Sequence, residues 1–385
     1  MNRNKYAKIT AVCVGALTLA LASSTMAYAD PTPAAFRTYA AVGSDTTQDV
    51  WNGLTNGTAA TSKSVASYNA FLTGSLTIKT KSTGPVFKRP TGSGNGVLAL
   101  SASNNTPFLF DNGAGGTVNI ANQVNFARSS SGPSSSFPGT ALTYIPFARD
   151  AVSIVGRNLS SGIASNFTTD QIRAIFSCTN SADGRITTAA GADPVYNAST
   201  TVKQQLNPLI PQAGSGTRTF FLAAAGLDGT TPAKTLGACV SDAAYPENDG
   251  TVLKTTGSVI PFSVAQWISQ KNGVTTNTVA TTSLKLTKIN SSSATAGTAP
   301  TLTPGTLFGS ASTVPVPGVG KFNRDTYNVV NSTLIGSLAA TGLEKVLTTN
   351  LRTTASKSII SKYGFLPLTY TGDRTKYKTS GYTNS

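Results

Sequence analysis

The sequence predicts a mixed α/β protein of two lobes. Short apolar runs such as residues 151–155 are typical of buried strands, whereas 168–176, 263–270 and 334–349 carry apolar residues at helical spacing. Thr168 supplies a capping residue for the first of these helices. Strands that alternate with helices favour a largely parallel sheet, with ligand sites where strands end and helices begin. A chain of 385 residues is long enough for two lobes with apolar cores.

Residues 1–29 have the features of a signal peptide. Basic residues precede an apolar run at 9–22, and Ala27-Tyr28-Ala29 fits the small-x-small rule for cleavage. The run is too short for a transmembrane span, and no second long apolar stretch follows. Cys13 lies inside the run rather than at its end, which argues against a lipid anchor. We therefore expect a secreted protein, in the periplasm or outside the cell.

Two cysteines remain after cleavage, Cys178 and Cys239. In an oxidising compartment a lone pair of cysteines usually bonds, so we predict a disulfide between them. Two buried free thiols are the alternative.

Composition excludes several classes of function. Histidine is absent, which removes Ser-His-Asp and Cys-His catalysis and histidine metal sites. The 15 acidic residues form no calcium loop and no carboxylate cluster for magnesium. We therefore expect neither an enzyme nor a cofactor. The net charge of +15 indicates anionic partners, but the basic residues are dispersed rather than interleaved with aromatics, which argues against nucleic acid. A cationic surface without a specific partner stays open.

Four loops rich in glycine and hydroxyl residues are the strongest functional signal. Gly214-Ser215-Gly216-Thr217 directly precedes an apolar, helix-forming run, and segments 43–49, 92–96 and 128–132 repeat the pattern. Glycines let backbone N–H groups converge, hydroxyls add donors, and a helix N-terminus carries partial positive charge. One such loop is often only a helix cap. Four of them predict an anion site.

In their order along the chain, these loops resemble those of the phosphate-binding proteins of ABC importers and their PBP-like relatives. Residues 43–48, 92–96, 126–131 and 214–217 are similar to the family's four ligand loops. The resemblance implies the type II periplasmic binding fold, in which mixed sheets are flanked by helices and the ligand cleft lies between two lobes. The segment 144–155 resembles the strand that crosses between the lobes. The implied division is lobe 1 at 30–146 and 326–385, and lobe 2 at 147–325.

The resemblance also implies a ligand held mainly by neutral hydrogen bonds and helix N-termini. The residues it assigns are Thr46, Thr47 and Gln48 in the first loop, Ser93, Gly94 and Asn95 in the second, Ser129 and Ser130 in the third, and Ser215, Gly216 and Thr217 in the fourth. Arg128, Arg149 or Arg218 could add a bidentate contact, because guanidinium geometry matches a tetrahedral oxyanion. A salt bridge is the alternative for each. For Arg149 and Asp150 we prefer a hinge-proximal ion pair.

Two departures from the family leave the ligand open. The family usually carries Arg-x-Asp before Gly-Ser-Gly-Thr, where this chain has Pro211-Gln212-Ala213, and an Asp at the position of Ser130. A buried carboxylate acceptor distinguishes protonated phosphate from sulfate. Asp45 or Asp49 could replace it, although both could equally be helix N-terminal charges. Phosphate is the first expectation, with sulfate, a phosphate ester or another small acid open.

We expect a monomeric solute-binding protein that serves an ABC permease or scavenges its ligand. The alternative is a surface or matrix interaction protein that retains the fold without the ligand. Loops that converge with unpaired donors would favour binding, whereas a cleft filled by side chains would favour the alternative.

Overall fold

The computed structural model describes residues 30–31, 36–56, 59–72, 74–104, 109–133, 141–160, 163, 165–230, 234–336 and 342–380. The predicted signal peptide, with Cys13, lies outside these residues. Within the described part, none of the helices combines the length and apolar character needed to cross a bilayer.

One long strand, β8 (Leu142–Arg157), joins two halves of a mixed sheet. The strand order is β14 (Ser241–Tyr245), β13 (Asn207–Pro211), β15 (Ser258–Ser263), β8, β20 (Asn323–Asn331), β7 (Phe126–Ser129), β1 (Tyr39–Gly43) and β2 (Val65–Ser67). Residues 142–151 of β8 pair with β20, whereas 152–157 pair with β15 and with β16 (Leu284–Leu286). The two short strands β21 (Leu366–Pro367) and β22 (Lys378–Ser380) also pair with β8. The sheet is therefore parallel within each half and antiparallel at the crossing.

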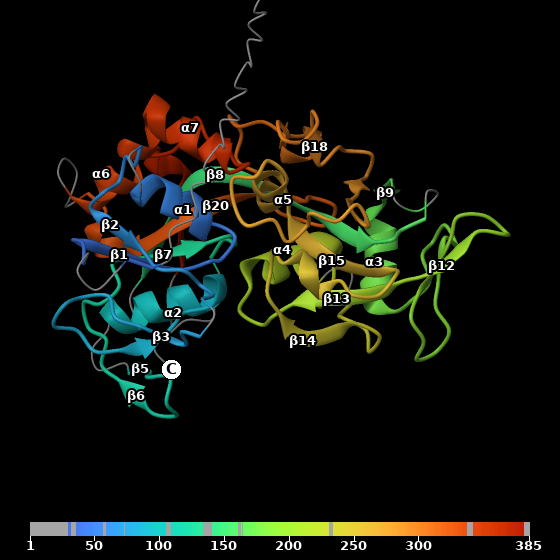
Figure 1. Ribbon diagram of the computed structural model, residues 1–385, viewed down its shortest axis with the longest axis horizontal. Helices are drawn as coiled ribbons and strands as arrows, with labels where there is room; N and C mark the ends of the chain where they lie inside the picture. The colour runs from blue at the N-terminus through green and yellow to red at the C-terminus, as the bar shows by residue number, and fades with distance from the viewer. Residues whose placement is uncertain are drawn as a thin grey trace, which may run out of the picture.

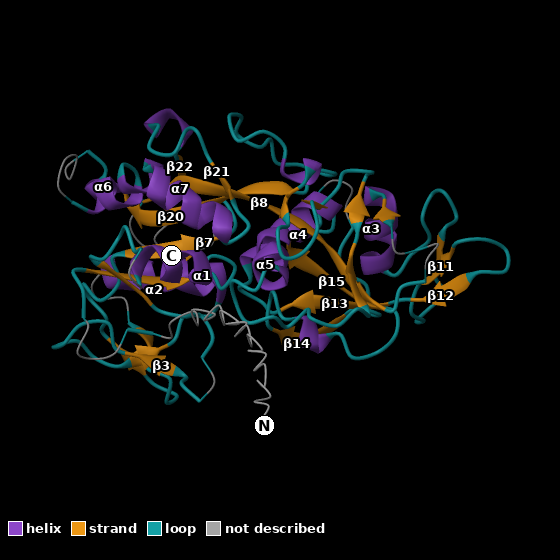
Figure 2. Ribbon diagram, turned by 45° about the horizontal axis from the view of Figure 1, so that its top comes forward, coloured by secondary structure: helices purple, strands orange, loops and turns teal. Residues whose placement is uncertain are grey.

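We call the half with β1, β2 and β7 lobe 1, and the half with β13, β14 and β15 lobe 2 (Figure 1). The helices are α1 (Gln48–Thr55), α2 (Gly92–Asn104), α3 (Thr169–Ser177), α4 (Gly216–Ala225), α5 (Val264–Lys271), α6 (Leu343–Leu347) and α7 (Thr354–Lys362). They flank the strands of both lobes (Figure 2). This is the predicted two-lobed fold of mixed sheets and flanking helices.

Small two- and three-stranded sheets complete the described part. They pair β3 (Thr77–Ile78) with β4 (Phe87–Lys88), β5 (Phe110–Asp111) with β6 (Thr117–Val118), β9 (Asn166–Phe167) with β17 (Lys288–Ile289), β18 (Thr295–Ala296) with β19 (Thr303–Pro304), and β11 (Val195–Asn197) with β10 (Ile186–Thr187) and β12 (Lys203–Gln205).

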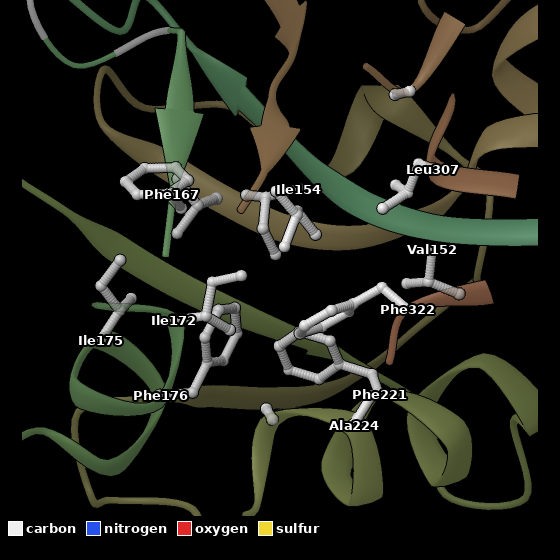
Figure 3. Packing of buried hydrophobic residues seen from close by; sticks show 14 of the residues in the cluster. Val152, Ile154, Phe167, Ile172, Ile175, Phe176, Phe221, Ala224, Leu307 and Phe322 are labelled. Atoms are coloured by element: carbon white, nitrogen blue, oxygen red, sulfur yellow. The ribbon is translucent and has the colours of Figure 1, made fainter. Parts of the chain in front are cut away.

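Each lobe has apolar packing on both faces of its sheet. In lobe 1, α2 packs on one face, and α1 and α7 pack on the other. In lobe 2, Phe176 of α3 and Phe221 of α4 pack with ring centroids 4.8 Å apart, and Phe322 lies against Phe221 (Figure 3). Ala148 of β8 packs in an apolar core of lobe 1, whereas Ala151 of the same strand packs in an apolar core of lobe 2. This change lies within a few residues of the predicted boundary after residue 146, and the division itself stays a prediction.

The predicted helices are confirmed where capping and periodicity agree. Thr168 caps α3 by accepting from the Gln171 N–H, and the Gln171 side chain accepts from the Thr168 N–H, which completes a capping box. Segment 263–270 forms α5, capped by Ser263. The segment 334–349 differs from the prediction, because the described helix there spans only Leu343–Leu347. The predicted disulfide is confirmed, with the Cα atoms of Cys178 and Cys239 6.0 Å apart.

Candidate functional site

The four predicted loops lie at the ends of strands or the starts of helices. The first follows β1 and leads into α1, the third follows β7, and the fourth runs from β13 into α4. The second begins α2. Ser215 caps α4 by accepting from the Arg218 N–H at 3.0 Å, which turns the chain so that the helix starts at Gly216.

The loops meet in one buried group of hydroxyls, which we call the hydroxyl cluster: Thr46, Ser93, Ser130, Ser215 and Thr217. The Thr46 and Thr217 hydroxyl oxygens lie 3.2 Å apart, as do those of Ser93 and Ser130. The first pair joins lobe 1 to lobe 2.

Glycine makes this close approach possible. The Gly94 N–H donates to the Gly214 carbonyl at 3.0 Å. Gly92 has a φ of +84°, and a Cβ there would lie 2.6 Å from the Gly214 oxygen. A Cβ on Gly216 would collide with the hydroxyl oxygens of Ser93 and Ser130. The loops therefore need these glycines in order to touch.

A carboxylate that we did not predict already occupies the start of α4. Oε2 of Glu247 accepts hydrogen bonds from the Ser215 hydroxyl and, at 3.0 Å, from the Thr217 N–H. The donors of the fourth loop therefore do bind an anionic oxygen, as the loop chemistry predicts, but that oxygen belongs to the protein.

Asp45 and Glu247 form a coupled acid pair beside the hydroxyl cluster. Burial, and then the charge of Glu247, raise the pKa of Asp45 well above its ordinary value. Burial also acts to raise the pKa of Glu247, but hydrogen bonds from Asp45 and Ser215 outweigh it and leave that pKa lowered. A single proton on this pair is therefore held by Asp45 rather than by Glu247.

Arg324 is the guanidinium that reaches the hydroxyl cluster. Its Nη2 donates to Thr217 Oγ1 and to Asp150 Oδ2, both at 2.9 Å. The side chain is 3% exposed and lies 5.3 Å from the ring centroid of Phe220. Its Nη1 is buried and finds no hydrogen-bond partner among the described residues. One donor group of Arg324 is thus not satisfied by the described part of the protein.

The three predicted arginines make protein contacts instead. All five N–H donors of Arg128 are engaged, with the carbonyls of Ala41, Gly43, Ser44 and Tyr68 and the Ser67 hydroxyl. Arg218 pairs with Asp242 at 2.6 Å. Arg149 pairs with Asp325 at 2.7 Å. The preferred ion pair of Arg149 with Asp150 is therefore wrong, because adjacent strand residues point to opposite faces and each finds its partner on β20.

The remaining predicted residues lie around the hydroxyl cluster with local roles. Thr47 has a buried hydroxyl with no partner in the described chain, and Gln48 accepts from the Ala70 N–H. Asn95 donates to the Thr91 carbonyl, and Ser129 donates to the Ser131 carbonyl. Gly94 and Gly216 shape the loops rather than offer side chains.

Comparison with known proteins gives a family and a fold. The family model described as PBP superfamily domain matches residues 23–310. No curated protein sequence matches the chain. Among solved structures, an ABC-type phosphate transport receptor from Vibrio cholerae is 15% identical, with 85% of this chain and 99% of that chain covered and a TM-score of 0.44.

Two further structures are similar at the same level. A putative phosphate ABC transporter substrate-binding protein with bound phosphate from Clostridium perfringens is 12% identical, with 86% and 99% of the two chains covered and a TM-score of 0.47. A phosphate-binding protein from Stenotrophomonas maltophilia is 16% identical, with 88% and 92% covered and a TM-score of 0.48.

Proposed function

The chain belongs to the PBP superfamily, and from that premise we propose that it is a secreted solute-binding protein that takes a small oxyanion between its lobes. Phosphate is the first choice, and sulfate or a phosphate ester is the next. Uptake through an ABC permease or scavenging outside the cytoplasm would be its purpose. We propose that it acts as a monomer without an enzymatic step.

The observation that carries the proposal is the start of α4. The Thr217 N–H and the Ser215 hydroxyl bind a carboxylate oxygen there, and Arg324 adds a buried donor beside Thr217. An oxyanion would use the same donors once Glu247 withdraws from them. Thr46 from lobe 1 lies 3.2 Å from Thr217, so such a ligand would be held from both lobes.

A second candidate is the interaction protein that keeps the fold without a ligand. It is favoured by Glu247, which fills the anion position of the fourth loop, and by the direct contact of Ser93 with Ser130. Calorimetric titration of the purified protein with phosphate, sulfate and a phosphate monoester separates the two functions. Saturable binding that survives moderate salt supports the receptor. Absence of heat, and of any shift in melting temperature, with all three anions would favour the interaction protein.

The double variant Ser215→Ala/Thr217→Ala tests the site itself. The double variant keeps the Thr217 N–H but removes the Ser215 hydroxyl donor and the Thr217 hydroxyl that holds Arg324. A lost buried donor costs about 1–3 kcal/mol, so the Kd for phosphate should rise at least about fivefold. Ser263→Ala is the matched control, because Ser263 caps α5 in the same lobe as Ser215 caps α4. We expect the control to lose stability without losing affinity. An unchanged Kd in a folded double variant would contradict the site assignment.

A further inference from the structure

A pocket of about 250 Å³ lies where both lobes meet β20, and we call it the β20 pocket. Residues 131–133, which follow β7, line it from lobe 1, and α4 lines it from lobe 2. Four residues of β20, Lys378 of β22 and two prolines of the loop before β20 complete the wall. We propose that this pocket binds a small organic carboxylate with a ring-shaped apolar body.

The β20 pocket is distinct from the proposed oxyanion site. None of the five residues of the hydroxyl cluster lines it. Arg324 belongs to both, because its guanidinium donates to the Thr217 hydroxyl and its side chain also lines the pocket. A ligand in the pocket does not require Glu247 to leave the start of α4. The inference therefore does not depend on the proposed function.

The charged side chains of the wall leave one positive charge without a partner. These side chains are Arg324, Asp325 and Lys378. Arg324 pairs with Asp150 at 2.9 Å, and Asp325 pairs with Arg149 at 2.7 Å. Both ion pairs are buried, so the protein itself compensates the charges of Arg324 and Asp325. Lys378 has no counter-ion at ion-pair distance in the described part of the chain, which favours an anionic ligand.

The Lys378 ammonium is half-buried and lacks a protein acceptor. It makes no hydrogen bond to a described residue, and it lies 5.4 Å from the ring centroid of Tyr327. A Cβ added to Gly132 would lie 3.8 Å from Nζ, so the ammonium lies beside a residue that has no side chain to cover it. Burial lowers the pKa of Lys378, although the charge of Asp325 opposes this shift. A carboxylate in the pocket would supply both an acceptor and a counter-charge.

The apolar part of the wall suits a ring better than an inorganic ion. Phe220 of α4 and Tyr327 of β20 line the pocket together with Pro315 and Pro317. An inorganic anion would leave these surfaces unused, whereas a ring would bury against them. Liquid water occupies about 30 Å³ per molecule, so the pocket has room for a ligand of about eight non-hydrogen atoms. Benzoate and cyclohexanecarboxylate are close to this size.

The test is calorimetric titration of the purified protein with benzoate and cyclohexanecarboxylate. Each is compared with its neutral amide and with acetate, a carboxylate without a ring. We expect at least one ring carboxylate to bind saturably and about tenfold or more tightly than its amide, because the amide lacks the charge that Lys378 recognises. It should also bind more tightly than acetate, because acetate buries no ring. If neither ring carboxylate exceeds both its amide and acetate, the proposal is wrong.

Lys378→Gln locates the binding site. The substitution removes the charge and keeps a polar side chain, so we expect affinity for the ring carboxylate to fall about tenfold or more. Phosphate affinity should stay close to wild type, because Lys378 makes no contact with the hydroxyl cluster. Lys376→Gln is the matched control, because Lys376 is exposed and does not line the pocket. It removes the same charge and should change neither affinity, so equal losses in the two variants would overturn the proposal.

Titration of the ring carboxylate into protein saturated with phosphate separates the two sites. We expect its affinity to be unchanged, whereas displacement of phosphate would place it in the oxyanion site and overturn the proposal. Wild-type protein that binds a ring carboxylate but no oxyanion would refute the proposed function and leave this inference standing. If Lys378→Gln fails to fold, the wild-type comparisons with the amides and acetate still decide the question.

Discussion

At the scale of single residues, two buried ion pairs between β8 and β20 hold the crossing between the lobes. Arg149 on β8 pairs with Asp325 on β20, and Asp150 on β8 pairs with Arg324 on β20. All four side chains are almost fully buried. Removing one partner of such a pair leaves an uncompensated buried charge, which typically costs about 3–5 kcal/mol. The same arrangement explains why Arg324, rather than Arg149, reaches the hydroxyl cluster, because neighbouring residues of a strand point to opposite faces.

Asp49 should make stability depend on pH. Burial raises its pKa to about 6, so between about pH 4 and pH 6 the folded protein holds a proton that the unfolded chain has lost. Stability therefore falls as the pH rises through this window. Asp49→Asn cannot titrate, and its stability relative to wild type should rise by about 1–3 kcal/mol between pH 4 and pH 7. Urea unfolding at both pH values measures this difference.

Asp111→Asn provides the control. Lys88 lowers the pKa of the exposed Asp111 carboxyl, so wild type gains stability from this group only as the pH rises to about 4, the ordinary aspartate value. Between pH 4 and pH 7 the stability of this variant relative to wild type should therefore stay almost constant. Parallel stability curves for wild type and Asp49→Asn would contradict the assignment of a raised pKa to Asp49.

The residues of the site show what the sequence could and could not predict. Thr46, Ser93, Ser130, Ser215 and Thr217 were predictable, because glycine and hydroxyl residues before helices have a local signature. Glu247 and Arg324 have no such signature. They reach the hydroxyl cluster from a loop before β15 and from β20, and only the strand order brings them there.

At the scale of elements, the disulfide ties the end of α3 to the segment that follows α4. Cys178 is the C-cap of α3, and Cys239 precedes β14. Phe176 and Phe221 connect the same two helices through apolar packing (Figure 3). Covalent and apolar contacts thus restrain the helix whose N-terminus carries the fourth loop.

Removal of this disulfide should lower stability without moving the site. The bond spans 61 residues, and the chain-entropy model gives about 4 kcal/mol for a loop of that length. We expect the free energy of unfolding of Cys178→Ala/Cys239→Ala, measured in urea, to fall by about that amount, while its phosphate affinity stays close to wild type. Each single variant should match the double variant, because either substitution breaks the bond. A double variant as stable as wild type would show that packing alone restrains α3 and α4.

The elements also show where sequence periodicity fails. α3 and α5 were predictable because a capping residue and an apolar repeat agree there. Segment 334–349 carries an apolar repeat, yet its described helix begins only at Leu343, after Gly342. The prediction placed the start of this helix too early, because it rested on apolar periodicity without a capping residue.

At the scale of the whole molecule, Thr46 and the bond from the Gly94 N–H to the Gly214 carbonyl join the lobes beside the site. The Thr46 hydroxyl lies 3.2 Å from that of Thr217 and accepts from Asn248, and the Thr46 carbonyl accepts from Gln266. All three partners belong to lobe 2. A ligand at the proposed oxyanion site would therefore lie beside this connection between the lobes.

Thr46→Val tests whether this connection keeps the lobes together. Valine has the shape of threonine but neither donates nor accepts, so the variant leaves the Asn248 amide and the Thr217 hydroxyl without this partner. A compact domain of this length has a radius of gyration of about 20 Å, and we expect small-angle scattering to give a larger value for the variant than for wild type. Circular dichroism should be unchanged, because the cores of the lobes lie elsewhere. A scattering curve identical to wild type would mean that the remaining connections, which are β8 and β20 with their buried ion pairs and the bond between Gly94 and Gly214, are sufficient to fix the lobes.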